Sequence, residues 1–388
     1  MKNPKKIKKY FFNNFPRTTI FILTIILTFT LDFVLTNIYN KRISDQKSSI
    51  RIEHPVFHHT FKKNSKIHES LHKNKYTIFT NSLGFKDRSI RTIQLVPTKH
   101  RILFIGDSFT EGIGLSYEDT FVGLIDSRLS KNNIEVLNAA RVSYSPIIYW
   151  RKIKFLIEDL GLDFDELVVF LDISDVRDEA SRYQLSENMN VISENMNVIS
   201  GKASHEPFTT KNIDYTYLLK KFFHKNTTVY FFTLNLVYDG IGFKQESKKP
   251  NLWSKIISSD FNLDKWTLNN EVYDKYGKDG VASMKKYMNK LLELTKEHKI
   301  DLTIAVYPHV SQIWYDDLNS MHVQIWKDWS KKNQIKFINY FPDFISKGLS
   351  SSEKIQLFKK YFLPGDVHYN KKGNKLIADK FIKTYLNQ

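Results

Sequence analysis

The sequence contains no cysteine. Disulfide bonds, cysteine-based zinc sites and thiol redox chemistry are therefore excluded, while a location outside the cytosol stays compatible with the composition. Acidic residues are nearly missing from the first 42 positions, where Asp32 stands alone against eight lysines and arginines, a local charge of +7. A recognisable nucleic-acid-binding module is missing as well. The +10 that remains of the net charge of +17 therefore indicates a solvated, lysine-rich surface and no nucleic-acid partner.

One long apolar run is present near the N-terminus. Residues 18–39 read TTIFILTIILTFTLDFVLTNIY, and 22 residues make a helix of roughly 33 Å, enough to cross a bilayer. Five lysines and Arg17 precede the run, and only Lys41 and Arg42 follow it directly. The positive-inside rule therefore predicts a single-pass inner-membrane protein with its N-terminus in the cytoplasm and the rest of the chain outside. No small-x-small cleavage site follows, which favours an uncleaved anchor over a signal peptide.

Asp32 is the unfavourable residue of this run. A carboxylate near the middle of a bilayer costs about 2.5–3.5 kcal/mol. Asp32 lies nearer the outer end of the run, where water or a polar partner can reach it.

The chain has ample material for a large core, with 388 residues of which 41% are hydrophobic and 14% aromatic. Changes of composition along it indicate four parts. We expect a basic cytoplasmic tail at 1–17, a transmembrane anchor at 18–40, an extracytoplasmic linker or extension at 41–98, and a folded domain at 99–388 with an insertion at about 183–280.

Residues 43–98 are polar and irregular, and they hold five of the twelve histidines of the chain. Imidazole is a common metal ligand. The helical i, i+4 spacing occurs in His68 with His72 and in His54 with His58, but no carboxylate cluster joins these histidines. We therefore expect a solvated extension here and no metal site. The five residues are His54, His58, His59, His68 and His72.

From residue 101 the pattern alternates between strands and helices. The run ELVVFLDI at 166–173 is almost continuously apolar, as expected for a strand buried on both faces. Alternating strands and helices predict a parallel α/β sheet. The expected strands are 101–105, 134–138, 166–173, 300–307 and 334–339, and the expected helices are 117–129, 147–160, 281–295 and 371–386.

The alternation is interrupted between residues 183 and 280. This stretch includes an exact tandem repeat, SENMNVI twice at 186–199, which predicts an exposed loop that tolerates duplication. Its aromatic residues either line a substrate groove or fill a small core, and we favour the core. They are Trp253, Trp266, Tyr273 and Tyr276.

Two short motifs carry the chemistry. Gly106-Asp107-Ser108-Phe109 follows the first apolar strand, which is where a nucleophilic serine would sit on a tight turn. Asp366-Val367-His368 lies near the other end of the chain, between a Pro-Gly break and the last helix. Residues i and i+2 of an extended loop point the same way, so Asp366 is placed to orient His368 as a base for Ser108. Such an Asp-x-His triplet alone is a common surface feature.

Together the two motifs resemble the first and last blocks of the SGNH/GDSL hydrolases. The first block reads GDSFTEG at 106–112 and the last reads DVHYNKKG at 366–373. The resemblance implies a flavodoxin-like α/β sheet and ester hydrolysis or acyl transfer through an acyl-serine. By position it implies Ser108 as the nucleophile, His368 as the base and Asp366 as the orienting acid.

The two middle blocks of that family depart from its pattern here. Ser143 takes the place of a glycine whose N–H helps to bind the oxyanion, and Ser174 takes the place of an oxyanion asparagine. The resemblance implies an oxyanion site of Ser108, Ser143 and Ser174, although losing one donor costs about 10²–10³ in rate. Asp172 and Asp175 allow a second interpretation, a glycosidase-like carboxylate pair. We favour turn-forming and capping roles for both.

The expected activity is therefore that of a membrane-anchored serine esterase or O-acyltransferase without metal or cofactor. The expected substrate is an acylated extracytoplasmic glycan, with O-acetyl as the expected acyl group. A lipid or lysophospholipid ester is the alternative substrate, and a non-catalytic glycan-binding or polysaccharide-assembly protein of the same fold is the alternative function. Whether water or a sugar hydroxyl receives the acyl group is left open.

Overall fold

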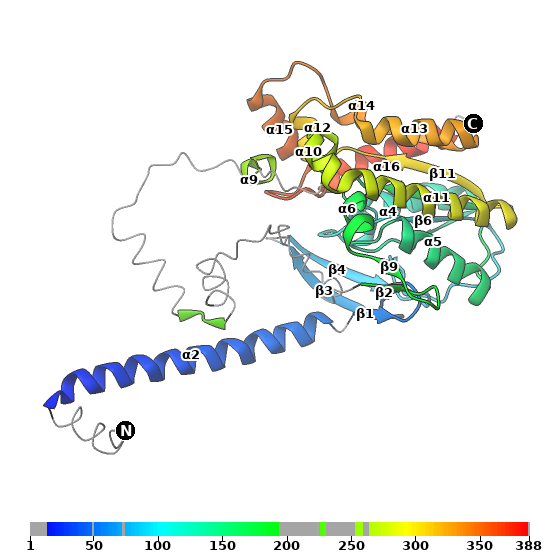
Figure 1. Ribbon diagram of the computed structural model, residues 1–388. Coiled ribbons are helices and arrows are strands. Elements are labelled where there is room, and N and C mark those ends of the chain that lie inside the picture. Colours follow the sequence, from blue (N-terminus) through cyan, green and yellow to red (C-terminus); the bar gives the residue numbers. More distant parts are fainter. Residues whose placement is uncertain are drawn as a thin grey trace. The chain divides into compact units, whose positions relative to one another are not determined.

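The computed structural model describes residues 14–48, 50–71, 74–193, 223, 226–229, 253–258 and 264–386 (Figure 1). The chain divides into two compact units. One comprises residues 1–48 with 206–250, and the other comprises 49–205 with 251–388. Most of the basic tail, His72, the second copy of the SENMNVI repeat and the greater part of the predicted insertion lie outside the described residues.

The first unit contains the long helix α2 (Pro16–Ser48). Its segment Pro16–Lys41 is long and apolar enough to cross a membrane, which fits an anchor, although a signal sequence has the same properties. Its threonines are accommodated locally, because the hydroxyls of Thr24, Thr28 and Thr30 each donate a hydrogen bond to the carbonyl four residues earlier. The polar side chains of this helix therefore do not prevent its burial in lipid.

Asp32, the acid of the apolar run, has partners within the same unit. Its carboxylate accepts hydrogen bonds from the hydroxyl of Thr36 at 3.1 Å and from the backbone N–H groups of Thr228 and Val229 at 3.0 and 3.1 Å. Asp32 is 8% exposed. Part of the predicted insertion thus supplies the polar partner that a carboxylate on an apolar helix requires.

The second unit is built on an eight-stranded sheet in the order β12-β11-β8-β6-β7-β5-β4-β3. The first five of these strands are parallel. Numbered along the chain, they follow the flavodoxin-like order 2-1-3-4-5, which confirms the expected fold class. These strands are β6 (His100–Ile105), β7 (Ile134–Asn138), β8 (Glu166–Leu171), β11 (Asp301–Val306) and β12 (Lys336–Asn339).

Helices cover both faces of this sheet (Figure 1). On one side α4 (Phe121–Leu129) packs against α16 (Lys371–Leu386). On the other side α5 (Pro146–Lys154) packs against α11 (Lys278–Glu297). The apolar positions that predicted the α11 helix are buried, as a core-facing stripe requires. They are Val281, Met284, Met288, Leu291 and Thr295.

Residues 50–87 differ from the solvated extension predicted for them. They form five strands, of which β3, β4 and β5 continue the parallel sheet in antiparallel fashion beyond β7. The strands are short and carry many polar side chains, so the sequence lacks a strong strand signal there. They are β1 (Arg51–His54), β2 (His58–Phe61), β3 (Lys66–Leu71), β4 (Asn74–Thr80) and β5 (Lys86–Asp87).

Two histidines of this region are buried. His58 is 8% and His59 is 1% exposed, and the Nδ1 atoms of the two rings lie 2.8 Å apart. The Nε2 atom of His59 lies 2.8 Å from the carbonyl oxygen of Val142. Burial lowers the pKa of His59 well below its usual value, so this histidine is a neutral packing residue that supports the loop after β7.

The aromatic residues from 253 onward in the predicted insertion join the main core. Trp253 and Trp266 are each 1% exposed and lie in the same apolar cluster as the sheet, and Tyr273 and Tyr276 pack against that cluster. The core-filling interpretation of these aromatic residues is therefore confirmed. The first copy of the repeat carries a short hairpin of β9 (Gln184–Leu185) and β10 (Val191–Ile192).

Shorter elements complete the unit. Those near the site are α3 (Ser108–Glu111), η1 (Tyr117–Asp119), α6 (Asp175–Ser181), α9 (Ser254–Ser258), α12 (Val310–Trp314), α13 (Met321–Asn333), α14 (Phe341–Phe344) and α15 (Ser351–Tyr361). The others are η2 (Ser130–Asn132), η3 (Phe155–Asp159), η5 (Lys265–Thr267), α10 (Asn270–Val272) and η6 (Tyr273–Gly277).

Candidate active site

The site lies where the strand order reverses. From β6 the chain moves to β7 on one side and then to β8 on the other, so the carboxyl ends of β6 and β8 border a crevice. In open α/β sheets this switch point is where ligands bind. Ser108 follows β6 and Asp172 follows β8. The topology alone therefore brings these two segments together.

Ser108 is the first residue of the short helix α3. Asp107 caps that helix, because its Oδ1 atom accepts a hydrogen bond from the N–H of Phe109 at 2.9 Å. Gly106 is required by packing, since a Cβ there would lie 2.2 Å from Oγ1 of Thr110 and 3.0 Å from the carbonyl oxygen of Phe170. The glycine lets the turn pass close to the adjacent strand β8, which fixes where the serine points.

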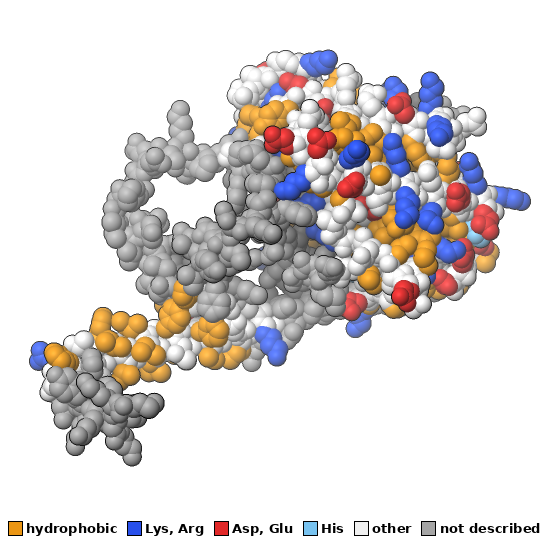
Figure 2. Space-filling model, viewed as in Figure 1, with side chains coloured by type: hydrophobic (Ala, Val, Ile, Leu, Met, Phe, Trp, Pro, Cys, Tyr) orange, Lys and Arg blue, Asp and Glu red, His pale blue; other side chains and the backbone are white. Residues whose placement is uncertain are grey.

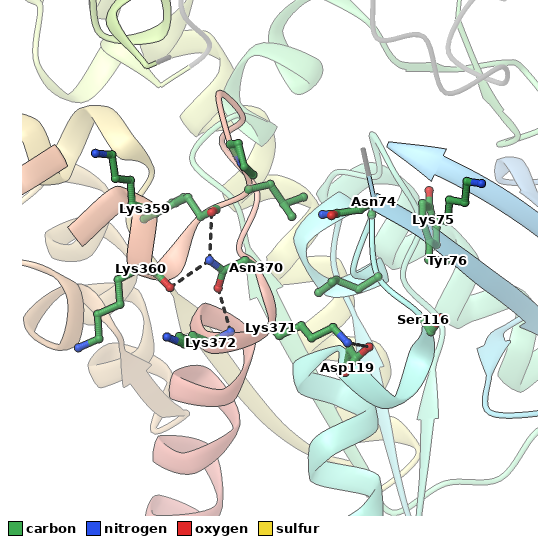
Figure 3. A pocket seen from close by; sticks show the side chains of 15 residues that line it. Asn74, Lys75, Tyr76, Ser116, Asp119, Lys359, Lys360, Asn370, Lys371 and Lys372 are labelled. Atoms are coloured by element: carbon green, nitrogen blue, oxygen red, sulfur yellow. Dashed lines mark hydrogen bonds and ion pairs between the residues drawn. The ribbon is translucent and has the colours of Figure 1, made fainter. Parts of the chain in front are cut away.

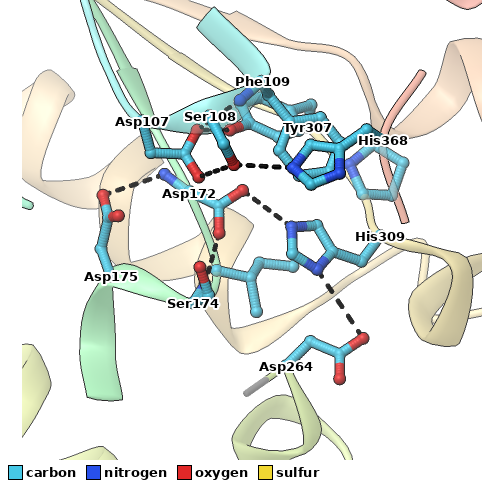
Figure 4. Close-up of polar contacts among 12 residues, drawn as sticks. Asp107, Ser108, Phe109, Asp172, Ser174, Asp175, Asp264, Tyr307, His309 and His368 are labelled. Carbon is cyan, nitrogen blue, oxygen red and sulfur yellow. Dashed lines mark hydrogen bonds and ion pairs between the residues drawn. The ribbon is translucent and has the colours of Figure 1, made fainter. Parts of the chain in front are cut away.

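Ser108, His368 and Asp366 form one hydrogen-bonded chain, and Figure 4 shows the contact of Ser108 with His368. Oγ of Ser108 lies 2.7 Å from Nε2 of His368, and Nδ1 of His368 lies 2.6 Å from Oδ1 of Asp366. The two motifs are 260 residues apart, and the fold brings them within direct reach. This is the spatial relation that activates a serine: a base on the hydroxyl and an acid that orients the base.

Asp366 also fixes the backbone beside the base. Its Oδ1 atom accepts the N–H of His368 at 3.0 Å in addition to the ring nitrogen. Burial lowers the pKa of His368, but the carboxylates of Asp366 and Asp107 together raise it, and the net result is a raised pKa. The imidazolium that forms when Ser108 loses its proton is therefore stabilised.

The loop that carries Asp366 and His368 is held from both sides. Nε1–H of Trp253 donates to the backbone carbonyl of Asp366 at 3.0 Å. Asn370 caps helix α16, because its Oδ1 atom accepts the N–H groups of Lys372 and Gly373 at 2.8 and 3.1 Å. The asparagine and glycine of the last motif thus have structural roles that position the base.

Asp107 is a second partner of the nucleophile. The hydroxyl of Ser108 lies 3.1 Å from Oδ2 of Asp107, and the hydroxyl of Tyr307 donates to Oδ1 at 3.1 Å. Burial, with Asp172 nearby, raises the pKa of Asp107 to about 7. A protonated Asp107 can donate to Oγ of Ser108, which leaves the serine hydrogen free to point at His368.

Two backbone N–H groups face no acceptor among the described residues. The N–H of Ser108 begins a helix, where no intrahelical acceptor exists. Ser143 adopts a left-handed conformation with φ of 60°, as its position in place of a glycine predicts, and its carbonyl accepts the hydroxyl of Tyr183 at 2.7 Å. The loop of Ser143 is joined to the nucleophile turn, because the N–H of Arg141 donates to the carbonyl of Gly106 at 3.3 Å.

Ser174 is engaged elsewhere. Its N–H donates to Oδ1 of Asp172 at 2.6 Å, and hydrogen bonding from its side chain helps to lower the pKa of that aspartate. Ser174 therefore stabilises the turn after β8 through Asp172, which differs from the role of the asparagine it replaces.

A buried ion pair that the sequence analysis missed lies beside the triad. Nε2 of His309 is 2.7 Å from Oδ2 of Asp172, and the His309 ring stacks on Phe109 at 4.9 Å between ring centroids. Burial lowers the pKa of His309, but Asp172 and Asp264 raise it to about 9, so the ring is cationic at neutral pH. His309 follows β11, and β11 is the parallel neighbour of β8. The position of this histidine directly after an apolar strand was the feature of the sequence that could have indicated it.

Three carboxylates meet under the nucleophile. One oxygen from each of Asp107, Asp172 and Asp175 lies within 4.8 Å of the others. Oδ2 of Asp175 accepts the hydroxyl of Tyr149 at 2.9 Å and the N–H of Asp172 at 3.1 Å, whereas its buried Oδ1 has no hydrogen-bond partner among the described residues. Burial raises the pKa of Asp175 well above the usual range. Raised pKa values that favour protonation of Asp107 and Asp175, together with the positive charge of His309, thus offset the negative charge of the three carboxyl groups. Both acids of the alternative glycosidase pair, Asp172 and Asp175, have the turn-forming roles that were favoured.

The site and the sheet are those that the SGNH/GDSL resemblance implies. The parallel strands have the flavodoxin-like order, and the three residues named from the two terminal motifs form the hydrogen-bonded chain. The two middle blocks differ in the way described for Ser143 and Ser174.

No protein-family model and no curated protein matches this sequence. Similar solved structures include the psychrotrophic esterase EstA from Pseudoalteromonas sp. (13% identity, 75% of this chain and 100% of that one, TM-score 0.36). They also include a GDSL-like lipase from Bacteroides thetaiotaomicron (13% identity, 75% of this chain and 90% of that one, TM-score 0.36). A third is the acetylxylan esterase Axe2 from Geobacillus stearothermophilus (10% identity, 75% of this chain and 95% of that one, TM-score 0.36). A likeness of this size assigns neither an activity nor a substrate to this chain.

Proposed function

We propose that this protein is a serine esterase or O-acyltransferase that works through an acyl intermediate on Ser108. One observation carries the proposal: Oγ of Ser108 lies 2.7 Å from Nε2 of His368, whose Nδ1 lies 2.6 Å from Asp366. A serine hydroxyl is a weak nucleophile unless such a base removes its proton. The hydrogen bonds that Trp253 and Asn370 make around the loop of His368 favour a base held in a fixed position.

In the first half-reaction, Oγ of Ser108 attacks the carbonyl carbon of the ester while His368 takes the hydroxyl proton. The negative oxygen of the tetrahedral intermediate is placed to accept the N–H groups of Ser108 and Ser143. The C–O bond to the alcohol then breaks, and His368 returns the proton to the leaving oxygen. In the second half-reaction, water or a sugar hydroxyl attacks the acyl-serine with His368 again as the base.

The proposed substrate is an acyl ester, O-acetyl in the first instance, on a glycan outside the cytoplasm. The apolar helix α2 and the lysines before it support a single-pass inner-membrane protein whose tail at 1–17 is cytoplasmic. The domain from about residue 99 would then act on extracytoplasmic material. A lipid or lysophospholipid ester is the alternative substrate for the same site.

The test uses the full-length protein in neutral detergent micelles with a small chromogenic acetate ester. We expect Ser108→Ala to lower kcat/KM by at least 10³-fold. The matched control is Ser127→Ala, an exposed serine on α4 that touches no part of the site and leaves the rate unchanged. A fluorophosphonate probe should label the wild type and the control but not the Ser108→Ala protein.

A non-catalytic glycan-binding or assembly role is the second candidate, because Ser174 stands where the family has an oxyanion asparagine and is engaged with Asp172. Equal ester turnover in the wild type and Ser108→Ala, together with no probe labelling, would favour that role. Labelling of Ser108 excludes it.

A further inference from the structure

A lysine-rich pocket lies beside the loop that carries the catalytic base (Figure 3). Its volume is about 610 Å³, within the size range of small-ligand sites. Three separate segments contribute lysines to it: the start of β4, the end of α15 and the start of α16. The lysines are Lys75, Lys359, Lys360, Lys371 and Lys372.

The charge of this pocket is unbalanced. Asp119 is the acid among the lining residues, and it pairs with Lys371 at 2.8 Å. The other four lysines make no ion pair with a described carboxylate. Lys371 and Lys372 also occupy the first turn of α16, where the helix dipole is already positive and acidic residues would be the stabilising choice. This accumulation of cations costs stability and suits a negatively charged ligand.

One wall of the pocket is continuous with the catalytic loop. Leu363 lines the pocket, and its N–H donates to the carbonyl of His368 at 2.9 Å. Asn370 ties the end of α15 to the same loop, because its Nδ2 atom donates to the carbonyls of Lys360 and Phe362 at 3.0 and 3.1 Å. The lysines at the end of α15 and the base are therefore held in one rigid arrangement.

The opposite wall continues from the nucleophile. Gly114, Leu115 and Ser116 line the pocket and follow α3 in the chain. The buried Nζ of Lys86 fixes that segment by donating to the carbonyls of Gly112 and Leu115 at 2.8 and 2.7 Å. Both walls are thus built from segments that continue directly from the loops of Ser108 and His368, so the pocket and the Ser108–His368 contact share the same supporting backbone.

We propose that this pocket binds the anionic group of an acidic glycan, a carboxylate or a phosphate, while an ester on a neighbouring sugar reaches Ser108. The inference rests on the proposed function and names its substrate class. A concave site suits a chain of sugar rings better than a flat membrane surface, because the lysines line a hollow that also offers Asn74 and Ser116 as hydrogen-bonding partners.

Binding is measured separately from turnover, on the full-length Ser108→Ala protein in neutral detergent. The probes are fluorescent pentagalacturonate, its neutral methyl ester, mannopentaose phosphate and neutral mannopentaose, each followed by fluorescence anisotropy. We expect at least one acidic probe to bind at least tenfold more tightly than its neutral counterpart, with an affinity that falls as salt is raised. Which acidic probe binds distinguishes carboxylate from phosphate recognition.

The decisive variant is Lys359→Gln/Lys360→Gln, which should weaken the acidic probe at least tenfold. The matched control is Lys331→Gln/Lys332→Gln, two exposed lysines in the last turn of α13 just as the first pair is in the last turn of α15. The control should bind like the parent.

Three results overturn the proposal: equal binding by the two double variants, equal binding of acidic and neutral probes, and binding of phosphatidylglycerol vesicles through these lysines without binding of any glycan probe. Because Ser108→Ala is inactive by design, failure of the esterase proposal and failure of the pocket proposal give separate results.

Discussion

Nε1–H of Trp253 donates a hydrogen bond to the backbone carbonyl of Asp366 at 3.0 Å, which connects the predicted insertion directly to the acid of the triad. Trp253 is 1% exposed and packs on Phe358 with 5.8 Å between ring centroids. The segment 253–258 is therefore part of the support of the catalytic loop, although it comes from a region whose sequence shows no clear period.

Replacing Trp253 by phenylalanine keeps a ring but removes the N–H donor. We expect Trp253→Phe to lower kcat on a neutral acetate ester about tenfold, because the loop that carries Asp366 and His368 loses one of its fixed points. The matched control is Trp329→Phe, which removes a bond of 2.8 Å to Asn289 away from the site. A loss of stability without any change in kcat would contradict a positioning role.

Asp366→Asn tests the orienting acid through the pH dependence of the rate. His368 acts as a base when neutral, and Asp366 raises its pKa while burial lowers it. Without the charge the pKa of His368 falls, so the acidic limb of the kcat/KM profile should move to lower pH while the plateau falls by about 10²–10⁴. An acidic limb that stays in place would show that Asp366 does not set the protonation of the base.

Ser174→Ala separates the two roles considered for this serine. Because Ser174 binds Asp172, we expect the alanine variant to lose less than about threefold in kcat, compared with about 10²–10³ for removal of an oxyanion donor. Steady-state kinetics on a neutral ester decides between them. A loss of a hundredfold or more would assign Ser174 to the oxyanion site.

Asp107 is predicted to tolerate asparagine but not alanine. Asparagine offers an oxygen to the N–H of Phe109 and the hydroxyl of Tyr307, as Asp107 does. Its NH₂ group lies opposite Oγ of Ser108 and can donate to it, as a protonated Asp107 can. We expect Asp107→Asn to stay within about threefold of the wild-type kcat, whereas Asp107→Ala loses the helix cap, worth about 1 kcal/mol, and most of the activity. Equal loss in both variants would mean that the charge itself is required.

Glu179 predicts a pH-dependent effect on stability. It accepts the hydroxyls of Ser145 and Ser283 at 2.8 and 2.7 Å and the N–H of Ile147 at 2.7 Å, and burial raises its pKa to about 7. A pKa raised on folding stabilises the protein at low pH, and this stabilisation is lost as pH rises from the unfolded value, about 4.5, through about 7. Glutamine does not titrate.

The difference in Tm between Glu179→Gln and the wild type should therefore become more favourable to the variant between pH 5 and pH 8. The full effect corresponds to at most about 3 kcal/mol. Thermal unfolding of the full-length protein in detergent at the two pH values measures it. The same difference at both values would be inconsistent with a buried, titrating Glu179.

The parallel sheet could be predicted from the sequence because its strands are short, near-continuous apolar runs separated by helical patterns. The triad could be predicted because both of its motifs lie at ends of such elements: Ser108 follows β6, and His368 precedes α16. The order of the motifs along the chain and the types of their residues were sufficient to pair Ser108 with His368, since the fold places the carboxyl ends of parallel strands at one edge of the sheet.

The strands before residue 88 could not be predicted in the same way. The burial of β3 alternates between exposed and intermediate along Lys66–Leu71, so it lacks the apolar run that marks the central strands. His59 illustrates the difficulty: it is a polar residue in a polar stretch, and only its long-range contact with Val142 makes it a core residue. Histidine is neutral and compact enough to be buried once such a partner exists.

The supporting residues of the site were missed for a related reason. Trp253 and His309 make hydrogen bonds to residues that are 113 and 137 positions away in the chain. No local pattern records such a contact. For His309, the position after β11 was a usable hint, whereas for Trp253 the sequence offers none.

Asp366 accepts both the ring nitrogen and the backbone N–H of His368 with one oxygen atom. Two hydrogen bonds to a single oxygen therefore hold the carboxylate and the ring together, whereas one contact of 2.7 Å joins this pair to Ser108. The pair and the serine are 260 residues apart in the chain. The proposed nucleophile therefore meets its base only in a chain whose first and last motifs have both folded into place.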